Sequence, residues 1–344
     1  MTNAERPLNN QVHQLYSLAV QDLRGGNGSS HEATSACPIC QCETAHPTFA
    51  LENMTERIMT CERCGLGRLM PLLTAEQLAK FYPADYYGTQ GAKFEALTEW
   101  LIRLLSWRRA RFLTHGLPPA ARVLDVGCGR GTILSALATL GYEAHGLERD
   151  LEATHGVTGN VHIRVADHLA DAAYPQEHFQ LVVLWHVLEH ISDIRETLTE
   201  IHRLLIPGGR LVVAVPNFSS FQAQWAGADW FHLDPPRHVF HIPAAALRQL
   251  LESCGFEVRS EHHFSLRHNP FGWVQSWLNR FGTLPRNGLY ILLQKHSVPL
   301  KFSPLLRLVL RLLYYLLMPW GVLLSIRDAV LRRGATVHLV AIRK

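Results

Sequence analysis

The stretch RVLDVGCGRGT, residues 122–132, constrains the fold of this chain more than any other. Val123, Leu124 and Val126 form the short apolar run of a buried parallel strand, and three glycines follow it. Glycine adopts positive φ readily and lets a ligand approach the backbone closely. Helical spacing begins at Ile133, so the free N–H groups of a helix would point toward the loop. A strand, a glycine turn and a helix in this order predict an α/β fold with a ligand on the turn.

The spacing of this loop differs from that of a dinucleotide site. The dinucleotide fingerprint has its third glycine, or an alanine, three residues after the second, and this chain has Thr132 there. Asp125 is awkward beside a pyrophosphate but suits a cationic ammonium group. Glu148 ends a second strand-like run, where a carboxylate can accept from both ribose hydroxyls, and Asp167 closes a third run, where it can accept from an adenine amino group. The pattern therefore favours a nucleoside that carries an amino acid.

Five segments between residues 122 and 217 resemble the successive motifs of class I S-adenosylmethionine (SAM) dependent methyltransferases. They are VLDVGCGRG, GLERD, VAD, FQLVVLWHVLEHISD and LLIPGGRLVVAVPN, in the order of that family. The glycine loop alone would also fit an ordinary α/β packing turn. The resemblance implies a doubly wound, mostly parallel, seven-stranded Rossmann-like sheet that binds SAM. The cofactor-binding residues that it implies are Asp125, Gly127, Gly129, Gly131, Glu148, Asp167 and Trp185.

Two C-x-x-C pairs precede this region and are separated by twenty residues. The four cysteines are Cys37, Cys40, Cys61 and Cys64. Gly65 follows the second pair, where a tight turn around a metal needs positive φ. Four thiolates form a closed tetrahedral site, so the spacing predicts a small zinc ribbon with structural Zn²⁺. The alternative is four unrelated buried cysteines, and Cys42 is a spare thiol that could compete for the metal.

Zinc-bearing segments of this kind also precede the methyltransferase domain in some families, followed by a stretch like FYPADYYG at 81–88. Tyr82, Tyr86 and Tyr87 in that stretch could pack against the cofactor, or they could form simple core. Helical spacing over 74–81 and 93–113 predicts a lid over the SAM site.

The expected organisation has six parts. They are a flexible N-terminus (1–36), the zinc ribbon (37–70), a helical lid or linker (71–115), the SAM-binding core (116–263), a helical hydrophobic insertion (264–335) and the final strand (336–344). A hydrophobic content of 47% supports a packed core, and a formal charge of +4 is too modest to imply nucleic acid by itself. MTNAERPLNN lacks the pattern of a secretion signal, so we expect a cytoplasmic protein whose seven cysteines serve as metal ligands or free thiols.

The insertion contains fifteen uncharged residues, 312–326, flanked by arginines and lysines. Spanning a bilayer takes about twenty apolar residues, so this run is too short, and Pro319 interrupts it. Residues 301–333 could lie in a membrane interface with the basic residues meeting anionic lipid. The alternatives are a helix that covers the substrate pocket or a dimer contact, and the oligomeric state stays open.

Candidate catalytic groups follow the fourth core strand. His186, Glu189 and His190 lie there and spell H-x-x-E-H, which marks an inverted zinc protease in other proteins. Here the motif follows a buried strand at the methyltransferase position, so that interpretation fails. His186 and His190 are candidate bases, Glu189 and His190 could bind a divalent cation that orients the acceptor, and all three could instead only shape the loop.

A second cluster, WFHLDPPRHVFH at 230–241, follows the fifth strand, where acceptor-binding loops lie in this fold. His238 is the first choice for the catalytic base. Arg237 suits an anionic substrate group such as phosphate or carboxylate, and His241 is a further substrate contact. The alternative is an inserted loop packed by its own aromatic residues.

The sequence therefore predicts a SAM-dependent methyltransferase that methylates oxygen on a small-molecule, sugar or lipid-linked acceptor, since no N-P-P-Y motif for nitrogen follows the fourth strand. An RNA methyltransferase is an alternative, but the arginines of the ribbon are scattered among glutamates, so a nucleic-acid partner is not expected. A zinc and membrane adaptor that kept the fold without turnover is the non-enzymatic alternative.

Overall fold

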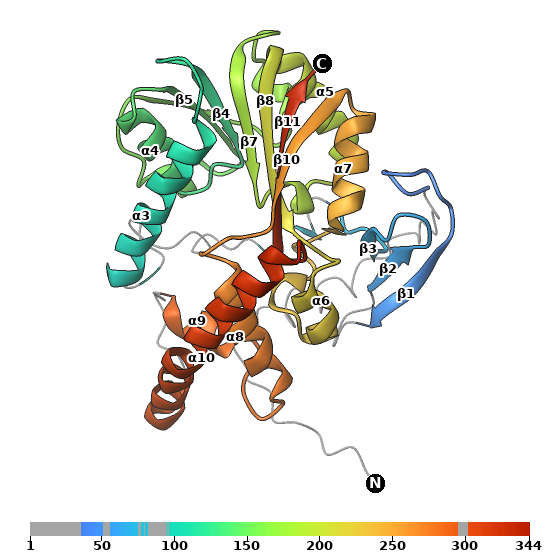
Figure 1. Cartoon of the computed structure of the whole chain (residues 1–344), viewed down its shortest axis with the longest axis vertical. Helices are drawn as coiled ribbons and strands as arrows, with labels where there is room; N and C mark the ends of the chain where they lie inside the picture. Colours follow the sequence, from blue (N-terminus) through green and yellow to red (C-terminus); the bar gives the residue numbers. More distant parts are fainter. Residues whose placement is uncertain are drawn as a thin grey trace.

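A seven-stranded sheet forms the centre of the structure, a computed structural model that describes residues 36–50, 56–74, 77–78, 80–81, 94, 96–294 and 302–344 (Figure 1). The N-terminal segment expected to be flexible, up to residue 35, and Tyr82, Tyr86 and Tyr87 lie outside the described residues.

The strand order of the large sheet is β10-β11-β8-β7-β4-β5-β6. In chain order the strands are β4 (Arg122–Val126), β5 (Glu143–Glu148), β6 (Val161–Val165), β7 (Phe179–Trp185), β8 (Leu205–Pro216), β10 (Phe256–His262) and β11 (Thr336–Arg343). All neighbours are parallel except β11, which runs antiparallel to β8 and to β10. The predicted doubly wound, mostly parallel seven-stranded sheet is confirmed, and the final strand is the antiparallel one.

Helices cover both faces of this sheet, and alternate residues of its central strands pack into the cores on the two faces. Val123 and Val183 belong to the core under α3 (Ala96–Leu113) and α4 (Thr132–Thr139). Leu124 and Val182 belong to the core under α5 (Ile194–Leu204) and α7 (Ala244–Ser253). Successive side chains of a strand point to opposite faces, so strands covered on both sides are apolar throughout. This explains why the central strands β7 and β8 contain continuous apolar runs in the sequence.

The remaining helices lie at the carboxyl ends of the parallel strands (Figure 1). They are α6 (Phe221–Ala226), α8 (Asn269–Arg280), α9 (Gly288–Leu293) and α10 (Pro304–Val330), with short 3-10 turns at Leu151–Thr154, Ala170–Ala172, Leu188–His190, Gly227–Asp229 and Phe231–Leu233. The helix α10 is longer than the predicted run of fifteen residues and continues through Pro319. Proline removes one helical hydrogen bond, but the turns before Pro319 pack in an apolar core with α8 and α9, and after it Gly321 lies close to Pro270 and Asp328 accepts a hydrogen bond from Trp273. The expectation that Pro319 interrupts the run was wrong.

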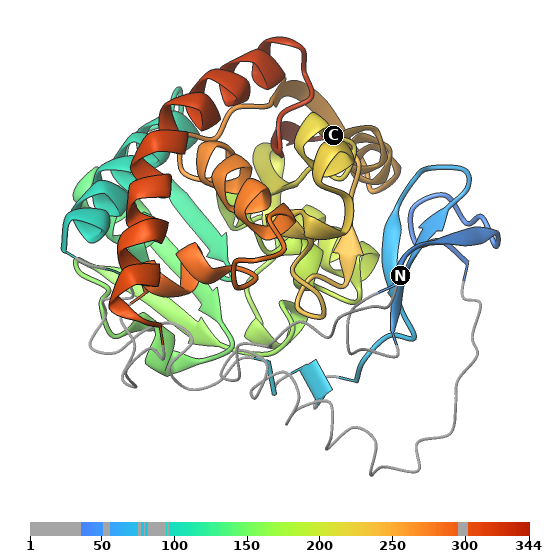
Figure 2. The same cartoon turned by 90° about the horizontal axis from the view of Figure 1, so that it is seen from below.

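The N-terminal cysteine segment forms a second, antiparallel sheet with order β1-β2-β3-β9. The strands are β1 (Ala45–Ala50), β2 (Arg57–Cys61), β3 (Gly67–Met70) and β9 (Phe240–His241). The fourth strand comes from the segment after β8, so the main domain completes the ribbon. Arg195 of α5 also donates hydrogen bonds to the backbone oxygens of Pro38 and Ile39, the second at 2.8 Å. The ribbon is therefore attached to the main domain rather than tethered beside it, on the side away from α3 (Figure 2).

Candidate functional site

The glycine loop after β4 leaves no room for side chains at two of its positions. Gly127 and Gly131 have φ of 66° and 62°, and Gly131 is the N-cap of α4. A Cβ on Gly127 would lie 2.7 Å from Cγ2 of Val187, and one on Gly131 would collide with Val157. The loop thus needs glycine for both conformation and space. The contact with Val187 also places the histidine-rich segment after β7 directly on the loop.

Glu148 lies at the end of β5, next to the loop. Its carboxylate is buried and accepts hydrogen bonds from the backbone N–H of Gly129, at 2.6 Å, and of Arg149, at 2.9 Å. Two fixed donors orient the carboxylate, and each of its oxygens keeps a second lone pair for a ligand. This geometry suits the two hydroxyls of a ribose. Gly129 itself has φ of 50°, which aims its N–H at Glu148.

Asp125 is the second buried carboxylate at this edge. Burial raises the pKa of Asp125 to about 7, and Arg109 opposes part of that shift. Burial also lowers the pKa of Arg109 to about 9. The Arg109 guanidinium lies over the ring of Trp185, 3.9 Å from its centroid. Trp185 ends β7, and its indole N–H is buried without a hydrogen-bond partner among the described residues. A carboxylate this costly to ionise indicates a place for a cationic group.

A bidentate ion pair connects the helix α3 to the glycine loop. Arg130, within the loop, donates to both oxygens of Glu99 at 2.7 and 2.6 Å, and both side chains are nearly buried. The role of this segment as a lid over the cofactor site stays a prediction. On α3, Leu101 and Leu104 are exposed.

Asp167 follows β6 and lies at the rim of this site. Its side chain is exposed and pairs with Arg149 at 3.0 Å. An exposed acceptor beside the ribose carboxylate remains available to an adenine amino group, so its role stays a prediction.

The histidines after β7 and β8 lie together at the same edge. Nδ1 of His190 donates to the backbone oxygen of Arg237 at 2.8 Å, and Nδ1 of His238 donates to the backbone oxygen of His232 at 2.9 Å. A carbonyl can only accept, so each neutral ring keeps its lone pair on Nε2. The centroids of the His190 and His238 rings are 4.7 Å apart. Burial is the main reason that the pKa of His238 lies well below its usual value, so this imidazole is neutral near pH 7.

Glu189 completes a group of three potential cation ligands. Ligand atoms of Glu189, His190 and His238 all lie within 4.8 Å of one another, and Oε2 of the buried Glu189 has no hydrogen-bond partner among the described residues. Burial raises the pKa of Glu189 to about 7. Two imidazoles and a carboxylate form a donor set that divalent metals accept. The sequence suggested Glu189 and His190 for this role, and His238 is the ligand that it missed.

His186 has a different environment. Its Nδ1 lies 3.2 Å from Oε1 of Glu189, and its ring packs against His268 with centroids 4.3 Å apart. Its Nε2 is buried and has no hydrogen-bond partner among the described residues. Burial, with Arg109 next, lowers the pKa of His186 to about 3, so it is a neutral and weak base.

The two residues predicted to contact substrate, Arg237 and His241, both interact with other residues of the protein. Arg237 forms an ion pair with Asp234, with its closest nitrogen 2.6 Å from Oδ1. His241 lies in β9 and donates from Nε2 to the backbone oxygen of Leu233 at 2.8 Å. His241 therefore joins the ribbon to the main domain, although its ring is within 6.4 Å of the His238 ring. Both roles stay predictions.

The four predicted metal-ligating cysteines converge at the other end of the structure. The Sγ atoms of Cys37 and Cys64 are 3.5 Å apart, as are those of Cys40 and Cys61. All four offer sulfurs within 4.8 Å of one another. A hydrogen bond from the Cys64 thiol lowers the pKa of Cys37 to about 4, so one sulfur of the group readily holds a negative charge. The sulfur of Cys42 instead forms hydrogen bonds with Thr44.

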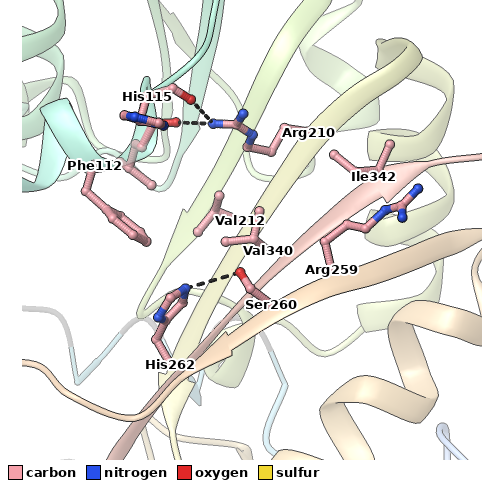
Figure 3. A pocket seen from close by; sticks show the side chains of 10 residues that line it. Phe112, His115, Arg210, Val212, Arg259, Ser260, His262, Val340 and Ile342 are labelled. Atoms are coloured by element: carbon pink, nitrogen blue, oxygen red, sulfur yellow. Dashed lines mark hydrogen bonds between the residues drawn. The ribbon is translucent and has the colours of Figure 1, made fainter.

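A cavity of about 380 Å³ lies beside the C-terminal end of α3, against the sheet. Figure 3 shows the side chains that line it. It is lined by Phe112 of α3, Arg210 of β8 and His262 of β10, among others. Arg210 lies near the start of β8, whereas the glycine loop and the histidines lie at the carboxyl ends of the strands. None of the residues that line this cavity is a predicted cofactor-binding or catalytic residue.

Comparison with known proteins shows similarity to methyltransferases. Residues 97–261 match the family described as "Methyltransferase domain". The chain is 34% identical to the "Probable S-adenosylmethionine-dependent methyltransferase" of Mycolicibacterium smegmatis over 142 residues, 40% of this chain and 52% of that protein. It thus spans about half the length of that relative.

Two further relatives are each 28% identical and match over 55% of this chain. They are the ubiquinone/menaquinone biosynthesis C-methyltransferase UbiE of Vibrio vulnificus, 85% covered, and the ubiquinone biosynthesis O-methyltransferase of Maricaulis maris, 83% covered. A solved SAM-dependent methyltransferase from Archaeoglobus fulgidus aligns with a TM-score of 0.45 at 18% identity, over 70% of this chain and 94% of that one. The fold is that of a Rossmann-like α/β domain with a mostly parallel sheet. Residues 97–261, just under half of the chain, match a methyltransferase domain, and the relatives named above include a SAM-dependent methyltransferase.

Proposed function

We propose that the whole chain transfers the methyl group of SAM to an oxygen atom of a small-molecule, sugar or lipid-linked acceptor. The observation that carries this proposal is the contact between Gly127 of the cofactor loop and Val187, because it joins the cofactor site to the histidine segment 186–190. One edge of the sheet then holds both a cofactor site and neutral imidazoles.

The cofactor site would be filled by SAM. Asp125 would face its ammonium group, Glu148 its ribose and Asp167 its adenine, with the three loop glycines allowing close approach. SAM supplies an activated methyl group, so the protein has to align the acceptor and remove its proton.

His238 would act as the base through Nε2, whose lone pair is fixed by the Nδ1 hydrogen bond to His232. His190 and His186 are the other candidates. Alternatively, a divalent cation on Glu189, His190 and His238 would bind the acceptor hydroxyl and favour its deprotonation. Arg109 and Arg267 are further cations near the histidines, and each would attract an anionic group of the acceptor.

The ribbon would hold one structural Zn²⁺ on Cys37, Cys40, Cys61 and Cys64. Four converging sulfurs leave no open ligand position, so the metal would stabilise the ribbon and take no part in methyl transfer. The cytoplasmic location expected from the sequence stays a prediction.

The test is release of S-adenosylhomocysteine (SAH) from SAM with a panel of phenolic, sugar and lipid-linked hydroxyl acceptors. We expect turnover with one of these classes and an O-methyl carbon in the ¹³C spectrum of the product. His238→Gln should lower kcat and leave the Kd for SAH unchanged, because His238 does not belong to the cofactor contacts. A product methylated on carbon, as the name of the Vibrio vulnificus relative specifies for that protein, would overturn the O-methylation proposal.

The two alternatives give different results in the same assay. Turnover on RNA with steep salt dependence would support the RNA methyltransferase, although Arg68 of the ribbon is buried and cannot contact RNA. Tight SAH binding without turnover on any acceptor class would support the non-catalytic adaptor.

A further inference from the structure

The helix α10 presents an apolar face to the outside of the molecule. We define this apolar face of α10 by six residues at intervals of three, four or seven: Leu308, Leu312, Leu316, Trp320, Leu323 and Val330. All six are more than half exposed, from 54% for Leu308 to 76% for Val330. Soluble proteins seldom expose an apolar stripe of this length, because burying it is strongly favourable.

The opposite side of α10 lies against the protein along the helix. Leu310 is fully buried in the core formed with α8 and α9. A Cβ on Gly321 would lie 2.7 Å from the backbone oxygen of Pro270, so α10 and α8 touch closely there. Near its end, Asp328 accepts a hydrogen bond from the Trp273 indole at 2.9 Å.

This packing distinguishes two modes of membrane association: a helix that spans the bilayer and a helix that lies in its interface. In the part of the chain that the structure describes, α10 is the one helix with the length and mean hydropathy, 1.7, of a membrane span. Its 27 residues would extend about 40 Å, enough for a bilayer core of about 30 Å. However, crossing a bilayer would strip the helix from α8 and expose Asp328 to lipid. A helix attached along one side and apolar on the other lies in the interface instead.

The net charge of the C-terminal region indicates which kind of surface the apolar face of α10 would contact. Residues 262–344 contain twelve Lys or Arg and one Asp or Glu, so this quarter of the chain carries +11 and the remainder −7. That single acid is Asp328, which is buried. The exposed Arg307 and Arg311 flank the apolar face of α10. A second copy of the chain would bring like charges together, whereas an anionic lipid surface attracts them.

The helix α3 extends this surface. Both views of the molecule show α3 and α10 on the same side, away from the ribbon (Figures 1 and 2). The exposed side of α3 has the same composition, with Trp100, Leu104 and Trp107 beside Arg103 and Arg108. Its one acid, Glu99, is paired with Arg130.

Tryptophans also border α10. Trp225, which is 42% exposed, and Trp277 line a groove of about 280 Å³ together with Leu324 and Arg327 of α10, whereas Trp273 of the same groove is buried. Tryptophan is enriched where protein meets the boundary of a bilayer, because its ring is apolar and its N–H is polar.

We propose that the apolar face of α10, with the exposed side of α3, docks the chain peripherally on an anionic membrane. The docking goes beyond the proposed function and does not depend on it, because vesicle binding needs neither cofactor nor acceptor. Its consequence for that function is that the acceptor is taken from the lipid surface, which lies beside the helices at the carboxyl edge of the sheet.

The test is co-sedimentation of the full chain with vesicles of phosphatidylcholine alone or mixed with phosphatidylglycerol. We expect binding to the mixed vesicles that weakens as salt rises. Leu316→Glu combined with Trp320→Glu should weaken binding by at least about tenfold, because two exposed apolar side chains that would insert into the lipid become charged. Arg307→Gln should weaken it about fivefold on mixed vesicles only. Leu72→Glu is the matched control, since Leu72 is an exposed leucine outside this surface.

Circular dichroism and Tm serve to check that each variant is folded. We expect all of them to fold, because the substituted side chains are exposed. As a second measurement on the unmutated chain, brominated lipid should quench tryptophan fluorescence, and Trp320→Phe should reduce that quenching. Failure of the folded chain to bind mixed vesicles, or equal binding by the double variant, would overturn the proposal. So would a dimer in sedimentation equilibrium that the double variant dissociates, because the face would then bind a second copy.

Discussion

Asp125 should make the affinity for SAH depend on pH. Its pKa of about 7 in the folded chain lies above the usual value for aspartate, because burial outweighs the attraction of Arg109. The ammonium group of SAH offers a further cationic partner. If only the ionised carboxylate binds it, affinity falls tenfold for each pH unit below 7. From pH 8 to pH 5 we therefore expect Kd to rise about 100-fold.

The same residue affects the stability of the ligand-free chain in the opposite sense. Because the folded pKa of Asp125 is raised, the folded chain binds more protons than the unfolded chain between about pH 4 and 7. Its contribution to the free energy of unfolding is therefore lost as pH rises through that window, by about 1.4 kcal/mol per unit. Asp125→Asn removes this dependence.

Calorimetric titration of SAH at several pH values measures the effect, with chemical denaturation beside it. Asp125→Asn should bind SAH weakly at every pH and yet be at least as stable as the unmutated chain at pH 8 without ligand. Other buried groups also titrate, notably Glu189, whose pKa is also about 7, so the difference between the two proteins is the quantity to compare. An SAH affinity of the unmutated chain that is constant from pH 5 to 8 would refute the reasoning.

Two further predictions concern the loop and the ribbon. Gly131→Ala should weaken SAH binding at least tenfold in calorimetry, because the new methyl group collides with Val157; Gly141→Ala, which has φ of 85° and open space, should keep that affinity, and equal losses in both would contradict the steric argument. Cys40→Ser should abolish the one zinc per chain measured by elemental analysis and lower Tm by about 5 °C or more, since Cys37 and Cys61 belong to the main core; an unchanged metal content would exclude the four-cysteine site.

The fold was predictable because its signals are local in the sequence, and the signals for the candidate cofactor site are local as well. The strand, the loop glycines and Asp125 lie within one stretch of eleven residues, and Glu148 ends the next strand. Each of these residues has its role through its own backbone conformation or its place at a strand end. Such signals do not depend on distant parts of the chain.

The features that were missed depend on distant contacts. The strand β9 has two residues and pairs with β3, about 170 positions earlier, so no pattern marks it. Arg109 reaches Trp185 from a helix whose sequence resembles any basic helix. His238 joins Glu189 and His190 only because the chain returns after β8.

The C-terminal helix shows a third kind of limit. Propensity predicts a break at Pro319, since proline costs about 3 kcal/mol inside a helix. Contacts of the flanking turns with α8 and α9 offset that cost, and they are tertiary contacts that a short window cannot detect.

The central claim is that the edge formed by β4, β5 and β7 binds SAM. Its most direct test is calorimetric titration of SAH into the unmutated chain, Glu148→Ala and Glu143→Ala, the last at the opposite end of the same strand. Glu148→Ala should lose about 100-fold or more in affinity, because two charge-assisted hydrogen bonds to ribose disappear, while Glu143→Ala should bind normally. Absence of SAH binding by the folded chain, or equal affinity in all three proteins, would contradict the account.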